Sequence, residues 1–158
     1  MDLYNEEFLK LTRSLEKHQV LYIVVGGFAV VRHGFSRSTG DLDLYLKDTS
    51  ENRARLVAAL EELGYGRLEP LLRAPFIAGY CEVMMDDGMY ADLMAELPGL
   101  PSQNFDEHYS MAVVAEISSS IVRFLNYNHL IRNKIATGRP KDLEDVRQLE
   151  LIRNGSGT

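Results

Sequence analysis

Three aspartates are the residues of this sequence whose type and spacing best suit metal-dependent chemistry. Asp41 and Asp43 are two residues apart in a segment that we predict as a strand over 41–46, so both side chains project from the same face of a sheet. Two neighbouring carboxylates repel each other unless a cation lies between them, and hard oxygen ligands suit Mg²⁺. Asp92 is the single acid of a second predicted strand, over 89–93, which could lie beside the first. We therefore expect the three carboxylates to form a site for Mg²⁺ or Mn²⁺.

A pair of glycines suggests how a phosphate could be held near these acids. Gly26-Gly27 follows an apolar segment predicted as a buried strand over 21–25 and precedes a short predicted helix over 28–33. Backbone amides at such a turn can face an anion, with help from the helix N-terminus. A Gly-Gly pair alone also fits an ordinary tight turn. The acid pair that follows about fifteen residues later makes the phosphate interpretation more specific.

The elements that must position these residues alternate between helix and strand. Apolar periodicity and capping residues predict an α/β (α+β) fold, with a mixed twisted β-sheet flanked by helices and a C-terminal helical pair. We predict one domain over 1–154, with a core over about 20–125, C-terminal helices over about 126–152 and a frayed tail over 155–158. The predicted elements are helices over 3–18, 28–33, 50–63, 126–136 and 140–152, strands over 21–25, 41–46, 113–117 and 121–125, and a hairpin of 81–85 with 89–93.

Composition excludes several classes of protein. The chain has 158 residues, of which 46% are hydrophobic and 25% charged, as expected for a globular domain rather than a disordered or collagen-like chain. The single cysteine, Cys81, excludes an internal disulfide and fits a reducing compartment. We see neither a membrane-spanning apolar run nor a signal-peptide pattern, so we predict a cytoplasmic protein. The net charge of −6 is the wrong sign for bulk electrostatic binding of nucleic acid.

Two segments resemble a known superfamily. Residues 24–29 (VVGGFA) and 37–44 (RSTGDLDL) resemble the opening of the polymerase-β-like, or minimal, nucleotidyltransferases. The resemblance is greatest to the small bacterial branch that includes abortive-infection, toxin–antitoxin and antibiotic nucleotidyltransferases. Residues 130–145 (LIRNKIATGRPKDLED) also resemble that branch, so the similarity extends over roughly 20–150, with a poor match over 65–79.

The resemblance implies metal-dependent transfer of a nucleoside monophosphate from an NTP such as ATP to a hydroxyl acceptor, with release of pyrophosphate. It implies that the three aspartates are both catalytic residues and metal ligands: Asp41, Asp43 and Asp92. It implies that the nucleotide is bound by Gly26, Gly27, Arg37, Thr39 and Lys134. Catalysis of such a transfer depends mainly on positioning and charge neutralisation. Carboxylates with a metal, a glycine turn and one or two cations provide both.

Each of these residues also has a plain structural interpretation. Asp41 and Asp43 could mark the solvated face of an edge strand, and Asp92 could pair with an arginine. Asp142 and Asp145, in the first turns of a predicted helix, are best explained by the helix dipole. The alternative function is a catalytically silent nucleotide- or partner-binding module with the same fold.

The acceptor and the partners stay open at this stage. The acceptor could be tRNA, a protein or a small molecule, and an antitoxin partner or a homodimer is compatible with the resemblance, whereas a membrane is not expected. The acidic balance disfavours a large RNA, although a basic strip could still hold one. The residues of this strip are Arg132, Lys134, Arg139 and Lys141.

Overall fold

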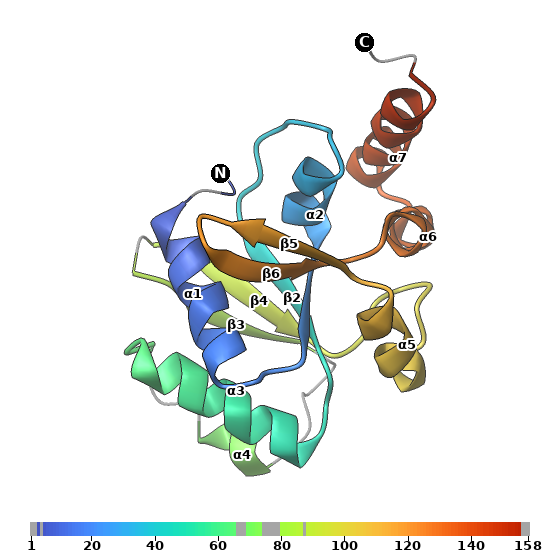
Figure 1. The fold of residues 1–158 in the computed structure, drawn as a ribbon. Helices are drawn as coiled ribbons and strands as arrows, with labels where there is room; N and C mark the ends of the chain where they lie inside the picture. Colours follow the sequence, from blue (N-terminus) through green and yellow to red (C-terminus); the bar gives the residue numbers. More distant parts are fainter. Residues whose placement is uncertain (1–2, 4, 66–68, 74–79, 87, 156–158) are drawn as a thin grey trace.

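A single mixed β-sheet organises the chain (Figure 1). A computed structural model describes residues 3, 5–65, 69–73, 80–86 and 88–155. The sheet has six strands in the order β3-β4-β2-β1-β6-β5. The strands are β1 (Tyr22–Val25), β2 (Leu42–Leu46), β3 (Tyr80–Met84), β4 (Tyr90–Met94), β5 (Val113–Ile117) and β6 (Ser120–Phe124). The pairs β2–β4 and β1–β6 are parallel and the others are antiparallel, so the predicted mixed sheet is confirmed.

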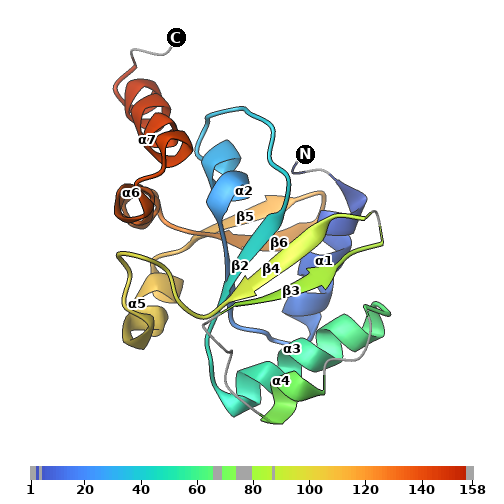
Figure 2. The ribbon, with the colours of Figure 1, turned by 180° about the vertical axis from the view of Figure 1, so that it is seen from behind.

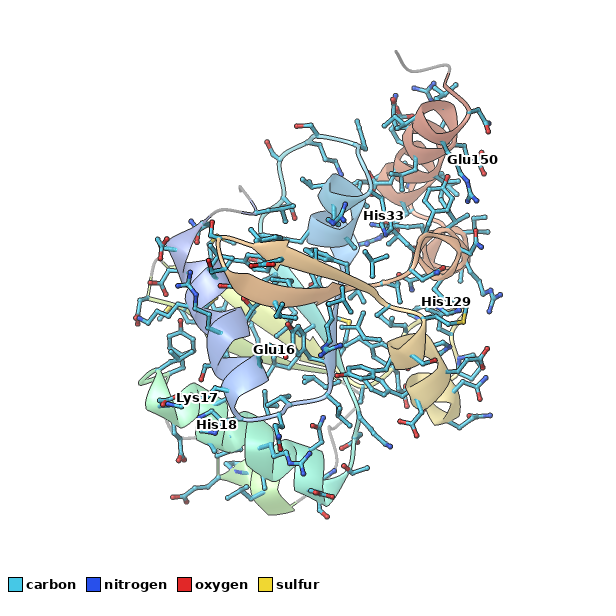
Figure 3. All side chains as sticks on the ribbon, in the orientation of Figure 1. Glu16, Lys17, His18, His33, His129 and Glu150 are labelled. Atoms are coloured by element: carbon cyan, nitrogen blue, oxygen red, sulfur yellow. The ribbon has the colours of Figure 1, made fainter. Side chains whose placement is uncertain are left out.

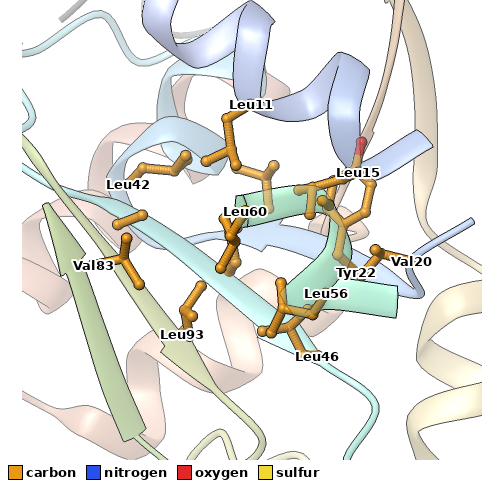
Figure 4. Close-up of a cluster of buried hydrophobic side chains, with 14 of the residues drawn as sticks. Leu11, Leu15, Val20, Tyr22, Leu42, Leu46, Leu56, Leu60, Val83 and Leu93 are labelled. Carbon is orange, nitrogen blue, oxygen red and sulfur yellow. The ribbon is translucent and has the colours of Figure 1, made fainter. Parts of the chain in front are cut away.

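One face of the sheet packs against two long helices. Helix α1 (Glu6–Lys17) begins at the N-cap Asn5, whose side chain accepts hydrogen bonds from two backbone amides, and α3 (Ser50–Glu62) lies next to it. Figure 4 shows the leucines of both helices meeting the alternate, inward side chains of β2 and β4. This apolar layer fixes which residues of β2 point the other way, and Asp43 is one of them.

The opposite face carries a second apolar cluster and the acids. Helices α5 (Phe105–Ser110), α6 (Tyr127–Thr137) and α7 (Pro140–Arg153) contribute to this cluster, which includes side chains from β1 and β2. Figure 2 shows the three helices along one side, so that none of the described helices crosses this face of β2, β4 and β3. Asp43 and Asp92 lie on this open part of the sheet.

The element boundaries differ from the predictions in a few places. Helix α2 (Gly26–Arg32) begins at the first glycine, so the pair forms its first turn instead of preceding it. Thr49, not Ser50, caps α3. The short helices α4 (Pro70–Arg73), α5 and a 3₁₀ turn, η2 (Ser102–Asn104), were not predicted, because each is too short to show helical periodicity. Of the two neighbouring methionines after Val83, Met85 is buried in the core and Met84 is 60% exposed.

Two C-terminal helices follow the last strand as predicted. The side chain of Asn126 caps α6 and accepts hydrogen bonds from the backbone amides of Asn128 and His129. Gly138 ends α6 in the left-handed conformation, and Pro140 begins α7. The predicted frayed tail over 155–158 lies, except for Gly155, outside the described residues. The poorly matched region over 65–79 is also described only in part.

A buried histidine pair should make the stability of this fold pH-dependent. His108 and His129 are 2% and 5% exposed, and their rings lie 4.9 Å apart (His129 is labelled in Figure 3). Burial lowers the pKa of both below the ordinary value of 6.5. As the pH falls below 6.5, these histidines bind protons in the unfolded chain before they do so in the folded chain. The free energy of unfolding therefore decreases by up to about 1.4 kcal/mol per pH unit for each such histidine.

Thermal unfolding between pH 7.5 and 5.5 tests this expectation. His129→Phe keeps a ring in place and removes one titrating group, so its melting temperature should fall less on acidification than that of the wild type. His33, whose pKa is also lowered by burial, should retain part of the dependence in the variant. Parallel curves for the variant and the wild type would contradict the assignment.

Candidate active site

The register of the sheet brings two of the predicted aspartates together. In the parallel pairing of β2 with β4, Asp43 stands opposite Asp92, and their carboxyls are hydrogen-bonded. Asp41 lies one residue before β2 and is exposed. All three line one cavity of about 440 Å³, at the low end of the range for ligand pockets.

The Asp43 carboxyl is held in an unfavourable environment for a negative charge. Burial raises its pKa to about 7, and the neighbouring charge and hydrogen bond of Asp92 act in the same direction. Asp41 adds to the effect, whereas the ammonium of Lys134 opposes it. Near neutral pH the pair therefore retains a proton for part of the time, and a cation at this point would replace it.

The two glycines provide the close approach that the acids require. Gly26 has a φ of +66°, and a Cβ built on it would overlap Oδ2 of Asp43. A Cβ on Gly27 would overlap Oγ1 of Thr39. Both glycines line the cavity, and no larger residue fits at either position without displacing a predicted site residue.

The two predicted cations are present in the cavity, but carboxylates already hold them. Arg37 donates from Nε and Nη2 to Asp145 at 2.7 and 2.9 Å and from Nη1 to the Ser38 carbonyl at 2.8 Å. The Nζ atom of Lys134 lies 3.1 Å from Asp142 Oδ1 and 3.0 Å from Asp145 Oδ2. These cations are therefore fixed in place, and part of their charge is neutralised.

Asp142 is the most heavily bonded of these acids. It accepts hydrogen bonds from Lys134, from Thr137 Oγ1 at 2.7 Å and from Nε and Nη2 of Arg139 at 2.7 and 3.2 Å. Burial on its own raises the pKa of this carboxyl, but the hydrogen bonds from Arg139, Thr137 and Lys134 outweigh burial and lower the pKa well below its ordinary value.

A comparison with protein families assigns the chain to one of them. The family described as nucleotidyltransferase of unknown function (DUF6036) matches residues 3–156. This chain belongs to that family. No curated protein matches the nucleotidyltransferase in sequence. None of its described helices is long and apolar enough to cross a membrane.

Solved structures share the fold of this nucleotidyltransferase. The Thermotoga maritima protein TM1012, assigned as a nucleotidyltransferase, is 14% identical, with a TM-score of 0.58, over 92% of this chain and 89% of its own. The antibiotic-resistance factor ANT(2″)-Ia, solved with adenylyl-2″-tobramycin, is 19% identical, with a TM-score of 0.52, over 93% and 87%. An antigenic nucleotidyltransferase-like protein of Paracoccidioides brasiliensis is 16% identical, with a TM-score of 0.52, over 94% and 78%. The nucleotidyltransferase fold implied by the resemblance is thus confirmed.

The structure brings the predicted site residues of this nucleotidyltransferase to one cavity, with one difference from the expectation. The cavity is lined by Gly26, Gly27, Arg37, Thr39, Asp41, Asp43, Asp92 and Lys134. Within the described ranges, however, no three His, Cys, Asp or Glu side chains are already arranged around a common point for a metal ion. Asp43 and Asp92 are adjacent, whereas Asp41 is an exposed side chain at the rim.

Two residues near this site were interpreted only as helix-dipole acids. Asp142 and Asp145 are 0% and 1% exposed, and both pair with cations of the cavity. A signal for this was available in the sequence. Asp142, Asp145, Val146 and Leu149 follow the spacing of one helix face, and acids on an otherwise apolar face require buried partners.

Proposed function

We propose that the chain transfers a nucleoside monophosphate from an NTP to a hydroxyl group of an acceptor, releases pyrophosphate and requires a divalent cation. The observation that supports this most directly is the register that sets Asp43 beside Asp92, next to the glycine turn at Gly26. Membership of a nucleotidyltransferase family supports nucleotidyl transfer in general. The requirement for a metal, the NTP donor and the hydroxyl acceptor are our proposals beyond family membership.

The residues present fit a hard divalent cation. Asp43 and Asp92 offer carboxylate oxygens side by side. The exposed Asp41 lines the same cavity and lies just outside β2. These three would hold Mg²⁺ or Mn²⁺, which when bound would neutralise charge on the phosphates. Burial and the neighbouring Asp92 raise the pKa of Asp43, so a cation held between these carboxyls would relieve their repulsion.

The charge of the cavity also favours a metal requirement. Five carboxylates and four cationic side chains line it, and three of the cations (Arg37, Lys134 and Arg139) are already paired with acids. A triphosphate without a metal would add several negative charges to this acidic set.

Binding of ATP should therefore depend on Mg²⁺. In isothermal titration with excess EDTA, we expect binding at least about tenfold weaker than with millimolar Mg²⁺, because the cation offsets the repulsion between triphosphate and aspartates. Equal affinity in EDTA and in Mg²⁺ would contradict the proposed metal site. A titration with Ca²⁺ in place of Mg²⁺ separates general charge screening from a site that selects the smaller ion.

The chemistry then divides between the two sides of the aspartate pair. Gly26 and Gly27 lie on the β1 side of Asp43, where their turn would pack against the triphosphate. Asp92 lies on the β4 side, where it would accept the proton of the attacking hydroxyl. Arg37 and Lys134 would contact the phosphates. The proposal thus assigns the nucleotide to the β1 side of the pair and the acceptor to its β4 side.

The paired cations favour a small acceptor over RNA. Of the basic strip expected from the sequence, Lys134 is buried and ion-paired, and Arg139 pairs with Asp142. Within this strip, and among the described residues, Arg132 and Lys141 are the two without a carboxylate partner. Two such cations are few for a polyanion that binds through many phosphate contacts.

The test is nucleotidyl transfer itself. The protein is incubated with each of the four labelled NTPs and Mg²⁺ or Mn²⁺, in parallel with an aminoglycoside, with tRNA and with a cell extract. An aminoglycoside belongs in the panel because ANT(2″)-Ia was solved with an adenylylated one. Release of pyrophosphate with label on an acceptor supports the proposal. Binding of NTP without transfer to any acceptor would favour the silent binding module, and label on an associated small protein would favour an antitoxin partner.

A further inference from the structure

Asp145 of α7 pairs with both cations that we propose to contact the phosphates, Arg37 and Lys134. Its carboxylate is the common partner of Arg37, which precedes β2, and of Lys134, which lies in α6. Its Oδ1 and Oδ2 atoms lie 2.7 and 2.9 Å from the donating nitrogens of Arg37, and Oδ2 lies 3.0 Å from Nζ of Lys134. One carboxylate thus connects three segments that are far apart in the sequence.

Both cations are held before any ligand arrives. The side chains of Arg37 and Lys134 are only 14% and 7% exposed, yet both line the cavity. The third nitrogen of Arg37 donates to the carbonyl of Ser38, and Lys134 also contacts Asp142. Long side chains of this kind are normally free to adopt many rotamers, so fixing them in advance removes an entropy loss from ligand binding.

Helix packing alone does not account for Asp145. A carboxylate can be buried only at a cost, and apolar side chains of similar volume often join elements equally well. Val146 and Leu149 already provide apolar contacts on the same face of α7. The acid is placed where the helix meets the cations of the cavity, which points to a role in ligand binding.

We propose that Asp145 is a positioning residue for the nucleotide: it holds Arg37 and Lys134 in the arrangement that receives the phosphates of the NTP. This inference rests on the proposed function. The inference also predicts the direction in which affinity for the nucleotide changes. Removing a negative charge from the edge of the cavity should by itself strengthen binding of a polyanion. Positioning predicts the reverse, since two cations released from Asp145 lose their fixed geometry.

The test is Asp145→Asn, which removes the charge and keeps the size of the side chain. The probe is α,β-methylene-ATP with Mg²⁺, and its Kd is measured by isothermal titration alongside the melting temperature. We expect Kd to increase about tenfold to a hundredfold, the range usual for partners that orient ligand-binding groups. Kd equal to or lower than that of the wild type would overturn the inference.

Asp106→Asn is the matched control. It removes the same charge from an aspartate that is also ion-paired, with Lys47 at 2.8 Å, but its side chain is 75% exposed and does not line the cavity. Its Kd should equal that of the wild type. A comparable loss of binding in both variants would show an effect that is not specific to Asp145 and would contradict positioning by Asp145.

Asp145→Glu covers the case in which the asparagine variant does not fold. It keeps the charge and displaces the carboxylate by one methylene, so weaker nucleotide binding at unchanged charge is expected, and an unchanged Kd overturns the inference. A purely structural role would lower the melting temperature and leave the Kd of the folded protein unaltered. Absence of nucleotide binding by the wild type would contradict the proposed function, whereas wild-type binding that Asp145 variants do not alter contradicts this inference alone.

Discussion

Replacing Asp43 by asparagine is expected to lower nucleotidyl transfer at least about a thousandfold while the protein remains folded. An amide cannot supply the negative charge that the paired carboxylates offer to a cation. Asp43 lines the cavity, is hydrogen-bonded to Asp92 and would be in contact with any side chain added at Gly26. The measurement is initial-rate transfer of labelled nucleotide to the acceptor that the wild type uses.

The same variant should be at least as stable as the wild type above neutral pH, which separates a catalytic effect from unfolding. The pKa of Asp43 is raised from 3.8 to about 7, so the folded protein retains a proton that the unfolded chain has already released. The wild type therefore loses stability as the pH rises from about 4 through 7, and Asp43→Asn, which does not titrate, should not. Melting curves at pH 6 and pH 8, without a divalent metal, measure the difference.

Asp86→Asn is a suitable control for these two experiments. Asp86 is an aspartate that pairs with Lys10 at 3.0 Å, just after the end of β3 and outside the cavity. Its transfer rate should match that of the wild type. If Asp43→Asn retained full activity, the assignment of the cavity as the active site would be wrong.

Replacing Gly26 by alanine should have the second largest effect, on both stability and activity. A residue with a Cβ is strained at a φ of +66°, and the added methyl group would overlap the Asp43 carboxylate. Strain and overlap together should cost roughly 3 kcal/mol of unfolding free energy. This corresponds to a decrease in melting temperature of about 6–12 °C for a chain of this size.

The transfer activity of Gly26→Ala should decrease by at least about a hundredfold in the protein that remains folded. The added methyl group displaces the Asp43 carboxylate, and transfer depends on accurate positioning of such groups. Gly40→Ala is the control for stability. A Cβ on Gly40 meets no atom within 4 Å, and the residue does not have a positive φ. Similar melting temperatures for the two alanine variants would contradict the argument from close approach.

Local patterns were sufficient to predict most of the fold. Alternation in the strand around Asp43 sets its leucines toward the helices and the acid toward the open face, and the structure confirms this division. The predicted helix over 126–136 is confirmed as α6, because the residues that cap a helix satisfy its terminal backbone groups and lie beside it in the sequence. The short helices escaped prediction because one or two turns do not contain a full period.

Pairing between distant residues could not be predicted in the same way. The sequence placed Asp142 and Asp145 in a helix, but it did not show that their helix faces the cavity and not solvent. It placed Lys134 and Arg37 near phosphates by resemblance, and it did not show the carboxylates that hold them. Likewise His108 and His129, which seemed unrelated by spacing, are in ring contact.

By itself, the sequence determined the order of the elements and which face of each strand is apolar, because hydrophobic period and capping act over a few residues. It also predicted that Asp41 and Asp43 share one site, and the structure places both on one cavity, with Asp41 exposed at its rim. Only the tertiary structure decided that Asp92 is the neighbour of Asp43, through the parallel pairing of β2 with β4. It likewise decided that α7 neutralises the cations of the cavity. The reason is physical: strand order and helix docking are fixed by packing over the whole core, and no local pattern records them.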